Sequence, residues 1–469
     1  MEAMVWERQA PTPAALEHAL DGVRDACFWI EDAPGTRYEP LTSDHATDLA
    51  VVGGGYAGLW TAVRAKQRDP GRRVLLLEAH QLGWAASGRN GGFCEASITH
   101  GEENGRSRWP HEYDELVRLG DENLDGIEQT VREHDLDVDF ERTGELAVAV
   151  EPHQVAWLEE MTEGRFLDAT SIRAEVTSPI YLAGRFLPGC ALVHPAKLVT
   201  ELGRLATTLG VEIAEGTPVE SLEGEGRIGP VLLRTPRGTV TADRVALATN
   251  VFPSLVRRHR PFTVPVYDYA VMTEPLSPSQ LDSLGWRGRQ GIGDLANQFH
   301  YYRLSADNRI LFGGYDAVYR FGKRIRAEYE RDPAVHRRLV SHLLTTFPQL
   351  EGVRVTHQWA GAIDTCTRFC AFWATSHGGR VAHTAGFTGL GVGATRFAGD
   401  VLLDLLDGAT TDRTSLEMVR RRPLPFPPEP LAGVGINLTR WSLDRADHRA
   451  GQRNLWLRTL DRLGLGFDS

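Results

Sequence analysis

Cysteine is scarce in this chain, and long hydrophobic runs are absent. The five cysteines (Cys27, Cys94, Cys190, Cys366 and Cys370) are odd in number and scattered, without a CxxC pair. We therefore expect neither a disulfide framework nor a metal site. No window approaches the roughly 18 apolar residues that a membrane span needs. The N-terminus (MEAMVWERQAPTPAAL) has acidic residues and prolines where a signal peptide is basic and apolar. These absences predict a cytoplasmic protein without a membrane partner.

Basic residues are in the minority. The 51 Lys and Arg residues face 62 Asp and Glu residues, which gives a formal net charge of −11. Phosphate contacts need clustered basic side chains, so we expect no nucleic-acid partner. An acidic surface can attract cationic substrates, but it also simply keeps a protein soluble. Charge alone therefore leaves the ligand class and the oligomeric state open.

Glycine is abundant, and its spacing is informative near residue 50. The stretch AVVGGGYAGLWTA (50–62) places the motif Gly53-x-Gly55-x-x-Gly58 between a hydrophobic strand and a helix. The first glycine permits a tight turn, the second lets a pyrophosphate approach the backbone, and the third lets helix and strand pack closely. Glu78 ends the next strand, where its carboxylate can accept hydrogen bonds from ribose hydroxyls. This context predicts a dinucleotide site.

The same spacing recurs in GEGRIG (224–229), but its context differs. It lies between two strand-like runs and precedes Pro230, so no helix follows. We predict a hairpin loop there and no nucleotide site.

Two further glycine-bearing segments distinguish the possible dinucleotides. GWAASGRNGG (83–92) follows the second strand, and its backbone amides can close over the far end of the same ligand. GFTGLGVGATRFAGDVLLDLL (386–406) leads into a helix whose N-terminus can stabilise negative charge on a reduced flavin. A nicotinamide dinucleotide needs neither segment. A long cofactor held at three separated points favours FAD.

Helices and strands alternate along the whole chain, without repeats or low-complexity tracts, which predicts two interlaced domains. The predicted helices span about 12–27, 56–69, 111–134, 152–165, 195–210, 326–347 and 439–462, with another after the glycine loop at 386. The predicted strands include 48–52, 72–78, 144–150, 211–214, 217–222, 230–235 and 244–248.

Seven stretches together carry a family resemblance. They are VVGGGYAGLWTA, GWAASGRNGG, HPAKLVTELGRLA, LATNVF, FHYYRLSADNRILFGGYDAV, WAGAIDTCTRF and GFTGLGVGATRFAGDVL. In their order and spacing the chain resembles the FAD-dependent amino-acid and amine oxidases of the D-amino-acid-oxidase (DAO) class, and within it the glutamylputrescine oxidase-like proteins. The resemblance covers most of residues 48–406.

The resemblance implies an α/β fold in which a Rossmann-type FAD-binding domain interlaces with an α+β substrate domain that has an antiparallel sheet. The implied segments are an N-terminal arm (1–45), the FAD-binding domain (46–108, 188–262 and 354–412), the substrate domain (109–187 and 263–353) and a C-terminal connector with a helical tail (413–469).

It also implies where the cofactor lies. The candidate cofactor-binding residues are Gly53, Gly55, Tyr56, Ala57, Gly58, Glu78 and Ala79; Ser87, Arg89, Asn90, Gly91 and Gly92 along the pyrophosphate, ribityl chain and ring; Val219, Ala248, Thr249 and Asn250 near the adenosine; and Gly361, Gly386, Phe387, Thr388, Gly389, Gly391 and Val392 toward the ring.

The chain departs from this pattern at two positions. Sarcosine oxidase-like members carry a flavin-linking cysteine that aligns near Gly361, so we expect FAD to be bound non-covalently, although Cys366 lies nearby. Those members also place a carboxylate-binding lysine where this chain has Gly393. The change makes an amine without an α-carboxylate a plausible substrate beside an amino acid.

Hydride transfer to flavin N5 from the carbon next to nitrogen requires a neutral amine. Shifting an amine pKa from about 10 toward 7 costs roughly 4 kcal/mol, and an apolar, aromatic pocket can impose that shift by desolvation. In NQFHYYRLS, His300 and Tyr302 share one strand face and Tyr301 and Arg303 the other. We expect the first pair to face the flavin, and aromatic packing in an ordinary sheet is the alternative.

The remaining candidate residues have equally plain alternatives. Lys323 is a candidate for promoting the reaction with oxygen, or else a solvated surface lysine. Arg368 and Arg396 can bind an acidic substrate group, or pair with a buried carboxylate such as Asp364 or Asp400. Trp359 can form a pocket wall or pack in the core.

Four functions remain open at this point. The first is an oxidase that takes hydride from an amine or amino acid, releases an imine that hydrolyses, and forms H2O2 from O2. The second is a dehydrogenase that uses another electron acceptor. A monooxygenase would need a separate nicotinamide site, for which no further strand–glycine turn–helix unit exists. A non-catalytic relic should have lost at least one of the three glycine clusters.

Overall fold

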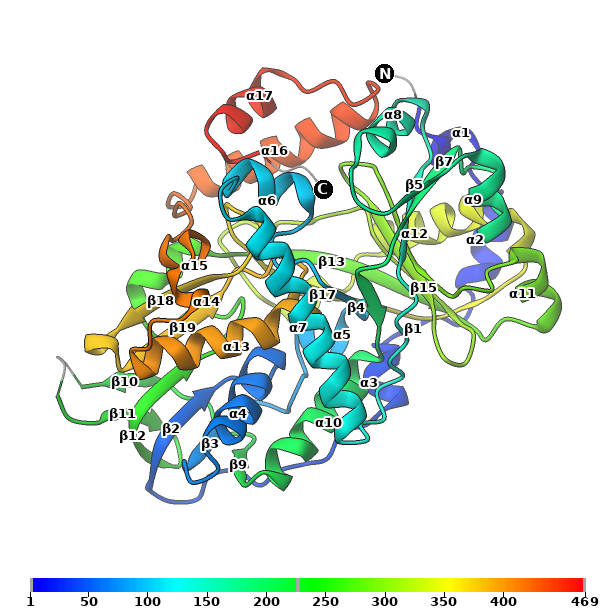
Figure 1. Cartoon of the computed structure of the whole chain (residues 1–469). Helices are drawn as coiled ribbons and strands as arrows, with labels where there is room; N and C mark the ends of the chain where they lie inside the picture. The colour runs from blue at the N-terminus through cyan, green and yellow to red at the C-terminus, as the bar shows by residue number, and fades with distance from the viewer. Residues whose placement is uncertain (1–2, 225–227, 467–469) are drawn as a thin grey trace.

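The computed structural model describes residues 3–224 and 228–466, and its strands form two large sheets that face a common interior (Figure 1). The eight-stranded sheet contains β2 (His45–Val52), β3 (Val74–Leu77), β9 (Val211–Ala214), β10 (Ser221–Glu223), β11 (Val231–Thr235), β12 (Gly238–Leu247), β18 (Phe372–Ser376) and β19 (Val381–Ala385). The nine-stranded sheet contains β1 (Arg24–Asp25), β5 (Glu145–Ala149), β6 (Arg165–Leu167), β7 (Ala183–Leu187), β13 (Val264–Thr273), β14 (Gly291–Asp294), β15 (His300–Leu304), β16 (Ile310–Gly314) and β17 (Val355–Thr365).

The eight-stranded sheet has a parallel centre in the order β12-β2-β3-β9, with β19 also parallel to β12. Strand β3 (VLLL) and the last residues of β2 (LAVV) and β12 (VAL) are continuous apolar runs, as expected for a parallel sheet that is buried on both faces. Helices α4 (Tyr56–Arg68), α10 (Pro195–Thr208) and α13 (Gly391–Asp407) pack against one another beside this sheet. The glycine turn 53–58 joins β2 to α4 and so lies at the carboxyl edge of the parallel strands, where ligands bind in such sheets.

The nine-stranded sheet is mainly antiparallel, in the order β1-β17-β13-β16-β15-β14-β5-β7-β6. Helix α12 (Pro333–Thr346) packs on β13 and β16, and α1 (Val5–Arg8) and α2 (Pro13–Leu20) pack on α12. The N-terminal arm therefore belongs to the core of this second unit.

Further helices connect and cover the two units. These are α3 (Phe28–Asp32), α5 (Ala86–Arg89), α6 (Glu102–Arg108), α7 (Tyr113–Glu133), α8 (Pro152–Glu160), α9 (Ala169–Glu175), α11 (Pro278–Leu284), α14 (Asp412–Ser415), α15 (Glu417–Arg420), α16 (Leu431–Asp447) and α17 (Leu455–Arg462). Strands β4 (Phe93–Glu95) and β8 (Cys190–Leu192) form a small antiparallel pair between the sheets. No helix within residues 3–224 and 228–466 is long and apolar enough to cross a membrane.

The expected fold class, a parallel-sheet unit interlaced with an antiparallel-sheet unit, is confirmed, and three details differ. Strand β17, in the segment expected to belong to the FAD-binding domain from 354 on, pairs with β13 in the nine-stranded sheet, and the domain bounds stay predictions. The predicted helix 439–462 is two helices, α16 and α17, and the predicted helix 12–27 ends at Leu20. Residues 225–227 of GEGRIG lie outside the described part of the chain, and the strands on either side of the motif, β10 and β11, pair antiparallel.

Candidate active site

A cavity of 1690 Å³ lies between the two sheets and is lined by residues from both. Three segments that are far apart in sequence reach it: 55–57 at the start of α4, 86–93 around α5 and β4, and 387–392 at the start of α13. The lining residues from our predicted cofactor set are Gly55, Tyr56, Ala57, Ser87, Arg89, Asn90, Gly91, Gly92, Ala248, Asn250, Gly361, Phe387, Thr388, Gly389, Gly391 and Val392.

The other predicted cofactor residues lie behind the cavity wall or beside it. Gly53, Gly58, Glu78, Thr249, Gly386 and Val219 do not line it, and Ala79 lines a separate pocket of 370 Å³ together with Tyr38 and Glu215.

The first glycine turn is built from contacts that exclude any side chain. Gly53 has φ +112°, and a Cβ on it would overlap the carbonyl oxygen of Ala248. A Cβ on Gly58 would overlap the carbonyl oxygen of Gly53, so α4 approaches the turn as closely as backbone atoms allow. A Cβ on Gly55 would lie 2.8 Å from Ser87 Oγ, which itself accepts a hydrogen bond from the Tyr56 amide at 3.0 Å. The first two glycine segments are thus locked together.

The Glu78 carboxylate stabilises the glycine turn through hydrogen bonds. Its carboxylate accepts hydrogen bonds from the Gly54 amide (2.6 Å), the His80 amide (2.8 Å) and Trp84 Nε1 (3.1 Å). Burial raises the pKa of Glu78, while these donors act to lower it. A carboxylate offers about four lone-pair sites, so one remains for a further donor such as a ribose hydroxyl.

Three buried polar atoms beside the turn have no hydrogen-bond partner within the described residues. They are Thr249 Oγ1, Asn250 Oδ1 and Thr384 Oγ1, and both Asn250 and Thr384 line the cavity. Asn250 also has φ +49°, which is uncommon for a residue other than glycine. Because buried polar atoms are nearly always hydrogen-bonded in proteins, these three indicate a place where a polar ligand binds. Together with the glycine cradle they fit a dinucleotide.

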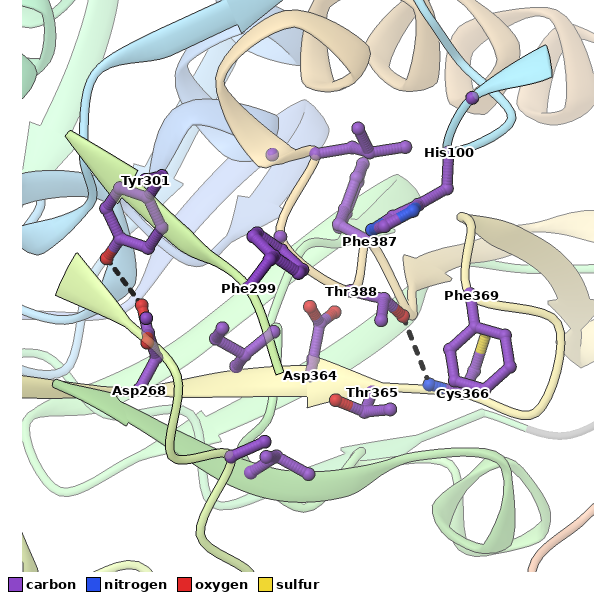
Figure 2. Close-up of a pocket in the computed structure, with 18 of the residues that line it drawn as sticks. His100, Asp268, Phe299, Tyr301, Asp364, Thr365, Cys366, Phe369, Phe387 and Thr388 are labelled. Carbon is purple, nitrogen blue, oxygen red and sulfur yellow. Dashed lines mark hydrogen bonds between the residues drawn. The ribbon is translucent and has the colours of Figure 1, made fainter. Parts of the chain in front are cut away.

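The third glycine segment is held by a buried carboxylate on β17. Asp364 accepts a hydrogen bond from the Gly386 amide at 2.6 Å. Burial raises the pKa of Asp364 to about 7, against the opposing effect of the Gly386 and Phe387 amides. Thr388 Oγ1 accepts a hydrogen bond from the Cys366 amide at 3.3 Å, and Figure 2 shows the Asp364 side chain on β17 pointing toward the loop that carries Phe387 and Thr388. The loop delivers the N-terminus of the 17-residue helix α13 to the cavity.

In the same sheet as Asp364, Tyr301 on β15 and Asp268 on β13 form a hydrogen-bonded pair (Figure 2). The Tyr301 hydroxyl donates to Asp268 Oδ2 at 2.5 Å. A Cβ on Gly91 or on Gly313 would lie 2.7 Å or 2.6 Å from the Tyr301 ring, so the ring fits between glycines of the two units. Burial raises the pKa of Asp268 to about 6 even though the Tyr301 hydrogen bond lowers it. The Asp268 carboxylate is therefore mostly ionised at neutral pH, where it can accept a proton, and it becomes protonated at slightly lower pH.

The structure places His300 and Tyr302, which we predicted to face the flavin, away from the cavity lining. His300 is fully buried, with Nδ1 2.7 Å from Asp294 Oδ2 and Nε2 2.8 Å from His342 Nδ1. The Tyr302 hydroxyl lies 2.7 Å from that of Tyr181, inside the core of the nine-stranded unit. Strand β15 is covered on both faces, so polarity does not reveal which face meets the cavity.

The structure places both arginines predicted to bind an acidic substrate group, Arg368 and Arg396, outside the cavity lining. Arg368 Nη1 donates to the carbonyl oxygens of Met418 (2.8 Å) and Arg421 (2.7 Å) and does not line the cavity. Arg396 lies over the Trp60 ring at 6.0 Å, and burial lowers its pKa to about 10. Neither arginine forms an ion pair with Asp364 or Asp400 in the described residues.

Lys323 also lies outside the cavity. Its Nζ is 3.5 Å from the Thr263 carbonyl oxygen and 5.7 Å from the centre of the Phe426 ring, and burial lowers its pKa. Trp359, in contrast, does line the cavity, and its Nε1 donates to the Arg89 carbonyl oxygen at 2.8 Å.

The positions that depart from the family pattern are closely packed. A Cβ on Gly393 would overlap the Glu95 carbonyl oxygen, so no larger residue fits there.

Cys366 lines the cavity but is fully buried, and its Sγ donates to the carbonyl oxygens of Cys370 (3.2 Å) and Gly386 (3.4 Å). Burial raises the pKa of the Cys366 thiol, which disfavours the reactive thiolate.

The sequence analysis missed two other carboxylates in the cavity. Glu95 and Glu145 line it, and neither side chain has a hydrogen-bond or ion-pair partner in the described part of the chain. Burial raises the pKa of both, and their mutual repulsion raises that of Glu145 further. The only signal was a glutamate opening the apolar strand GELAVAV. Among the described residues, 3–224 and 228–466, no group of three or more His, Cys, Asp or Glu side chains is placed to hold a metal ion.

The chain matches known proteins over most of its length. A model of the family described as FAD dependent oxidoreductase (DAO) matches residues 48–405. Gamma-glutamylputrescine oxidoreductase of Escherichia coli is 31% identical over 399 residues, which cover 80% of this chain and 88% of the relative. A probable oxidoreductase, OrdL, of Haemophilus influenzae is 28% identical over 79% of this chain and 85% of its own length. The crystal structure of glycine oxidase from Geobacillus kaustophilus superposes with a TM-score of 0.66 at 18% identity, over 81% of this chain and all of that one.

Proposed function

The chain belongs to the DAO family of FAD-dependent oxidoreductases, and on that premise we propose that it oxidises the C–N bond of an amine or amino acid with O2 as the electron acceptor. The substrate loses a hydride and a proton and becomes an imine, water hydrolyses the imine to a carbonyl compound and ammonia or an amine, and O2 takes up the two electrons as H2O2. Bound FAD supplies the two-electron acceptor between substrate and oxygen. The convergence of three glycine segments on one cavity with the Asp268–Tyr301 pair is the observation that carries this proposal.

The residues that would hold FAD come from all three segments. Gly55, Tyr56 and Ala57 at the start of α4 would bind the pyrophosphate, because amide groups and a positive potential gather at a helix N-terminus. Glu78 and Asn250 would bind hydroxyl groups with the lone pairs that the protein leaves unused. A buried, hydrogen-bonded Cys366 and a glycine at position 361 support non-covalent binding.

The cavity's acidic side chains favour a substrate that arrives as an ammonium ion. Glu95, Glu145 and Asp268 line it, and an amine must lose its proton before its C–H bond can donate a hydride. Asp268 is the proposed proton acceptor, because its pKa of about 6 keeps it ionised at neutral pH and the Tyr301 hydroxyl fixes one of its oxygens. Gly393 stands where the sarcosine oxidase-like members have a lysine that binds an α-carboxylate, and its close packing leaves no room for that side chain. This supports an amine substrate without an α-carboxylate.

An anaerobic screen tests the proposal. Purified holoenzyme is mixed with amines and amino acids, γ-glutamylputrescine among them because of the relative's name, and loss of the flavin absorbance is followed. We expect bleaching by a set of related amines and rapid recovery with peroxide release when O2 is admitted. Recovery with dyes or quinones but not with O2 would make the protein a dehydrogenase. Bleaching by NADPH alone, with none by amines, would refute the proposal. Release of free flavin by denaturation would separate non-covalent from covalent binding.

A further inference from the structure

The C-terminal tail beyond the matched family region completes the cavity. The tail runs from the proline-rich stretch RRRPLPFPPEP (420–430) through α16 and α17, and residues from all three parts line the cavity. In Figure 1 these helices cross the end of the molecule above α6 and beside α8. The outer wall of the cavity is therefore a feature of this chain that the family model, ending at residue 405, does not cover.

Helix α16 presents one face to the cavity and another to the outside. The lining positions recur every three or four residues, as one helix face requires: Ala432, Gly435, Ile436, Thr439, Arg440 and Leu443. The outward face carries exposed Val434, Leu438 and Trp441. Arg440 is thus the charged residue on a face of otherwise small or apolar side chains.

The tail is fixed to the body of the protein at two places that follow Arg440 in the chain. Asp447, at the end of α16, accepts hydrogen bonds from the amides of Asn297 (2.9 Å) and Gln298 (3.2 Å). Arg108 on α6 donates to the carbonyl oxygens of Gly464 (2.6 Å) and Gly466 (3.3 Å). Arg440 consequently has a defined position over the cavity.

Arg440 differs from the other arginines that line the cavity. Arg89, Arg106 and Arg453 each form an ion pair with a carboxylate. Arg440 has no ion-pair or hydrogen-bond partner among residues 3–224 and 228–466. Gln298, whose backbone amide bonds to Asp447 on the same helix as Arg440, is 8% exposed and lines the cavity, and its side-chain amide likewise lacks a partner in these residues. A half-buried guanidinium that lines the cavity without a partner is a site for an anion, because a guanidinium presents a planar fork of donors that matches a carboxylate.

We propose that Arg440 binds an anionic group, a carboxylate in the first place, at the end of the substrate remote from the oxidised amine. This inference rests on the proposed function for the identity of the reacting end. Two of the unpartnered charged residues that line the cavity lie in different parts of the molecule: Glu95 is on β4, whereas Arg440 is on α16, and Figure 1 shows the two elements apart. A long zwitterion with its ammonium near Glu95 and its carboxylate near Arg440 matches that arrangement.

The volume of the cavity agrees with a long substrate. Pockets for a single drug-sized ligand measure about 300–1,000 Å³, so 1690 Å³ holds a substrate chain beside a dinucleotide. A substrate of this kind carries its carboxylate several bonds away from the reacting nitrogen, which Gly393 also favours.

The test compares paired substrates on holoenzyme. ε-Aminocaproate and its longer homologues carry a distal carboxylate, and their primary amides have the same length without the charge. For Arg440→Met we expect kcat/KM to fall about 10- to 100-fold for the acids, mainly through KM, and to change less than about 3-fold for the amides. Arg440→Lys should restore part of the difference. Arg445→Met, on the outer side of the same helix with its guanidinium over Trp441, removes the same charge and should change neither series.

A binding measurement separates this inference from the proposed function. Calorimetric titration with glutarate, a dicarboxylate that cannot be oxidised, should show binding to wild type and to Arg445→Met, and none to Arg440→Met at the same concentration. Such a result supports the anion site even if no amine bleaches the flavin. Equal losses for acids and amides with an unchanged glutarate affinity would overturn it, as would a wild-type enzyme that does not distinguish acids from amides. Thermal unfolding of each variant confirms that the fold is kept.

Discussion

The two sheets of this protein hold their parts of the site in different ways. Beside the eight-stranded sheet, the backbone sets the geometry: Gly53, Gly55 and Gly58 are fixed by contacts that leave no room for a Cβ. Beside the nine-stranded sheet, side chains set it: Asp268 and Tyr301 meet across two strands, and their place in the cavity depends on which face of each strand points inward. The geometry beside the eight-stranded sheet can be predicted from a local sequence motif, whereas the geometry beside the nine-stranded sheet depends on the whole fold.

This difference explains which substitutions should act on the cofactor and which on the chemistry. A change in the glycine turn displaces backbone atoms and should prevent FAD binding altogether. A change on β13 or β15 leaves the backbone in place and should act on proton transfer or on stability. The following four predictions, one of which compares two variants, are ordered from the largest expected effect to the smallest.

Gly58→Val should have the largest effect. The new side chain would collide with the Gly53 carbonyl oxygen, and α4 cannot retreat because it packs against α13 and α10. We expect a protein without flavin absorbance and with a strongly lowered melting temperature. Gly189→Ala is the control, because its Cβ would make an ordinary contact of 3.5 Å with Ala96 Cβ. A yellow, stable Gly58→Val protein would contradict the role of backbone packing on this side.

Asp268→Asn should come next, with FAD retained. If Asp268 accepts the amine proton, kcat/KM should fall about 10²- to 10⁴-fold. In wild type the carboxylate must be ionised, so kcat/KM should rise with pH through a limb near the Asp268 pKa of about 6 and level off above it. The variant should lack this limb. A full pH–rate profile with the flavin content of each preparation tests both points, and a variant that keeps the wild-type profile would exclude Asp268 as the acceptor.

The sequence could predict the first unit in detail and the second only in outline. Strand β2, the glycine turn, α4 and β3 lie where the sequence predicts them, because strand, turn and helix signals coincide in this segment, and the cofactor-binding roles of Gly53 and Glu78 stay predictions. On β15, His300, Tyr302 and Leu304 are buried on one face, and Arg303 on the other is 2% exposed. With no polar face to mark solvent, the alternation of side chains did not tell which residues meet the cavity. Asp268 and Glu95 were missed because each lies in an ordinary strand pattern and gains its role only from neighbours distant in sequence.

Tyr301→Phe and Tyr302→Phe contrast the two faces of one strand. Loss of the Tyr301 hydroxyl removes the hydrogen bond that lowers the pKa of Asp268, so the limb of the pH profile should move to higher pH. Loss of the Tyr302 hydroxyl leaves that of Tyr181 unpaired in the core, which should lower the free energy of unfolding by about 1 kcal/mol. Its pH profile should not change. Urea unfolding and pH–rate measurements of both variants test this. A shifted pH profile in Tyr302→Phe and a loss of stability in Tyr301→Phe would instead support the original prediction that Tyr302 faces the flavin.

Glu145→Gln should give the smallest effect, and one of unusual sign. Burial and the neighbouring Glu95 raise the pKa of Glu145 above its unfolded value of 4.5, so its protonated form favours the native state at low pH, and this contribution is lost as pH rises through the folded pKa. The glutamine variant stays neutral and should therefore be more stable than wild type at about pH 9, by about 1 to 3 kcal/mol, and close to it at about pH 5. Urea unfolding at both pH values measures the difference, with exposed Glu159→Gln on α8 as the control that should show none. A Glu145→Gln protein destabilised at the higher pH would mean that the carboxylate has a cationic partner in the native protein, and the cavity would then lack the unpaired acidic groups from which an ammonium substrate was argued.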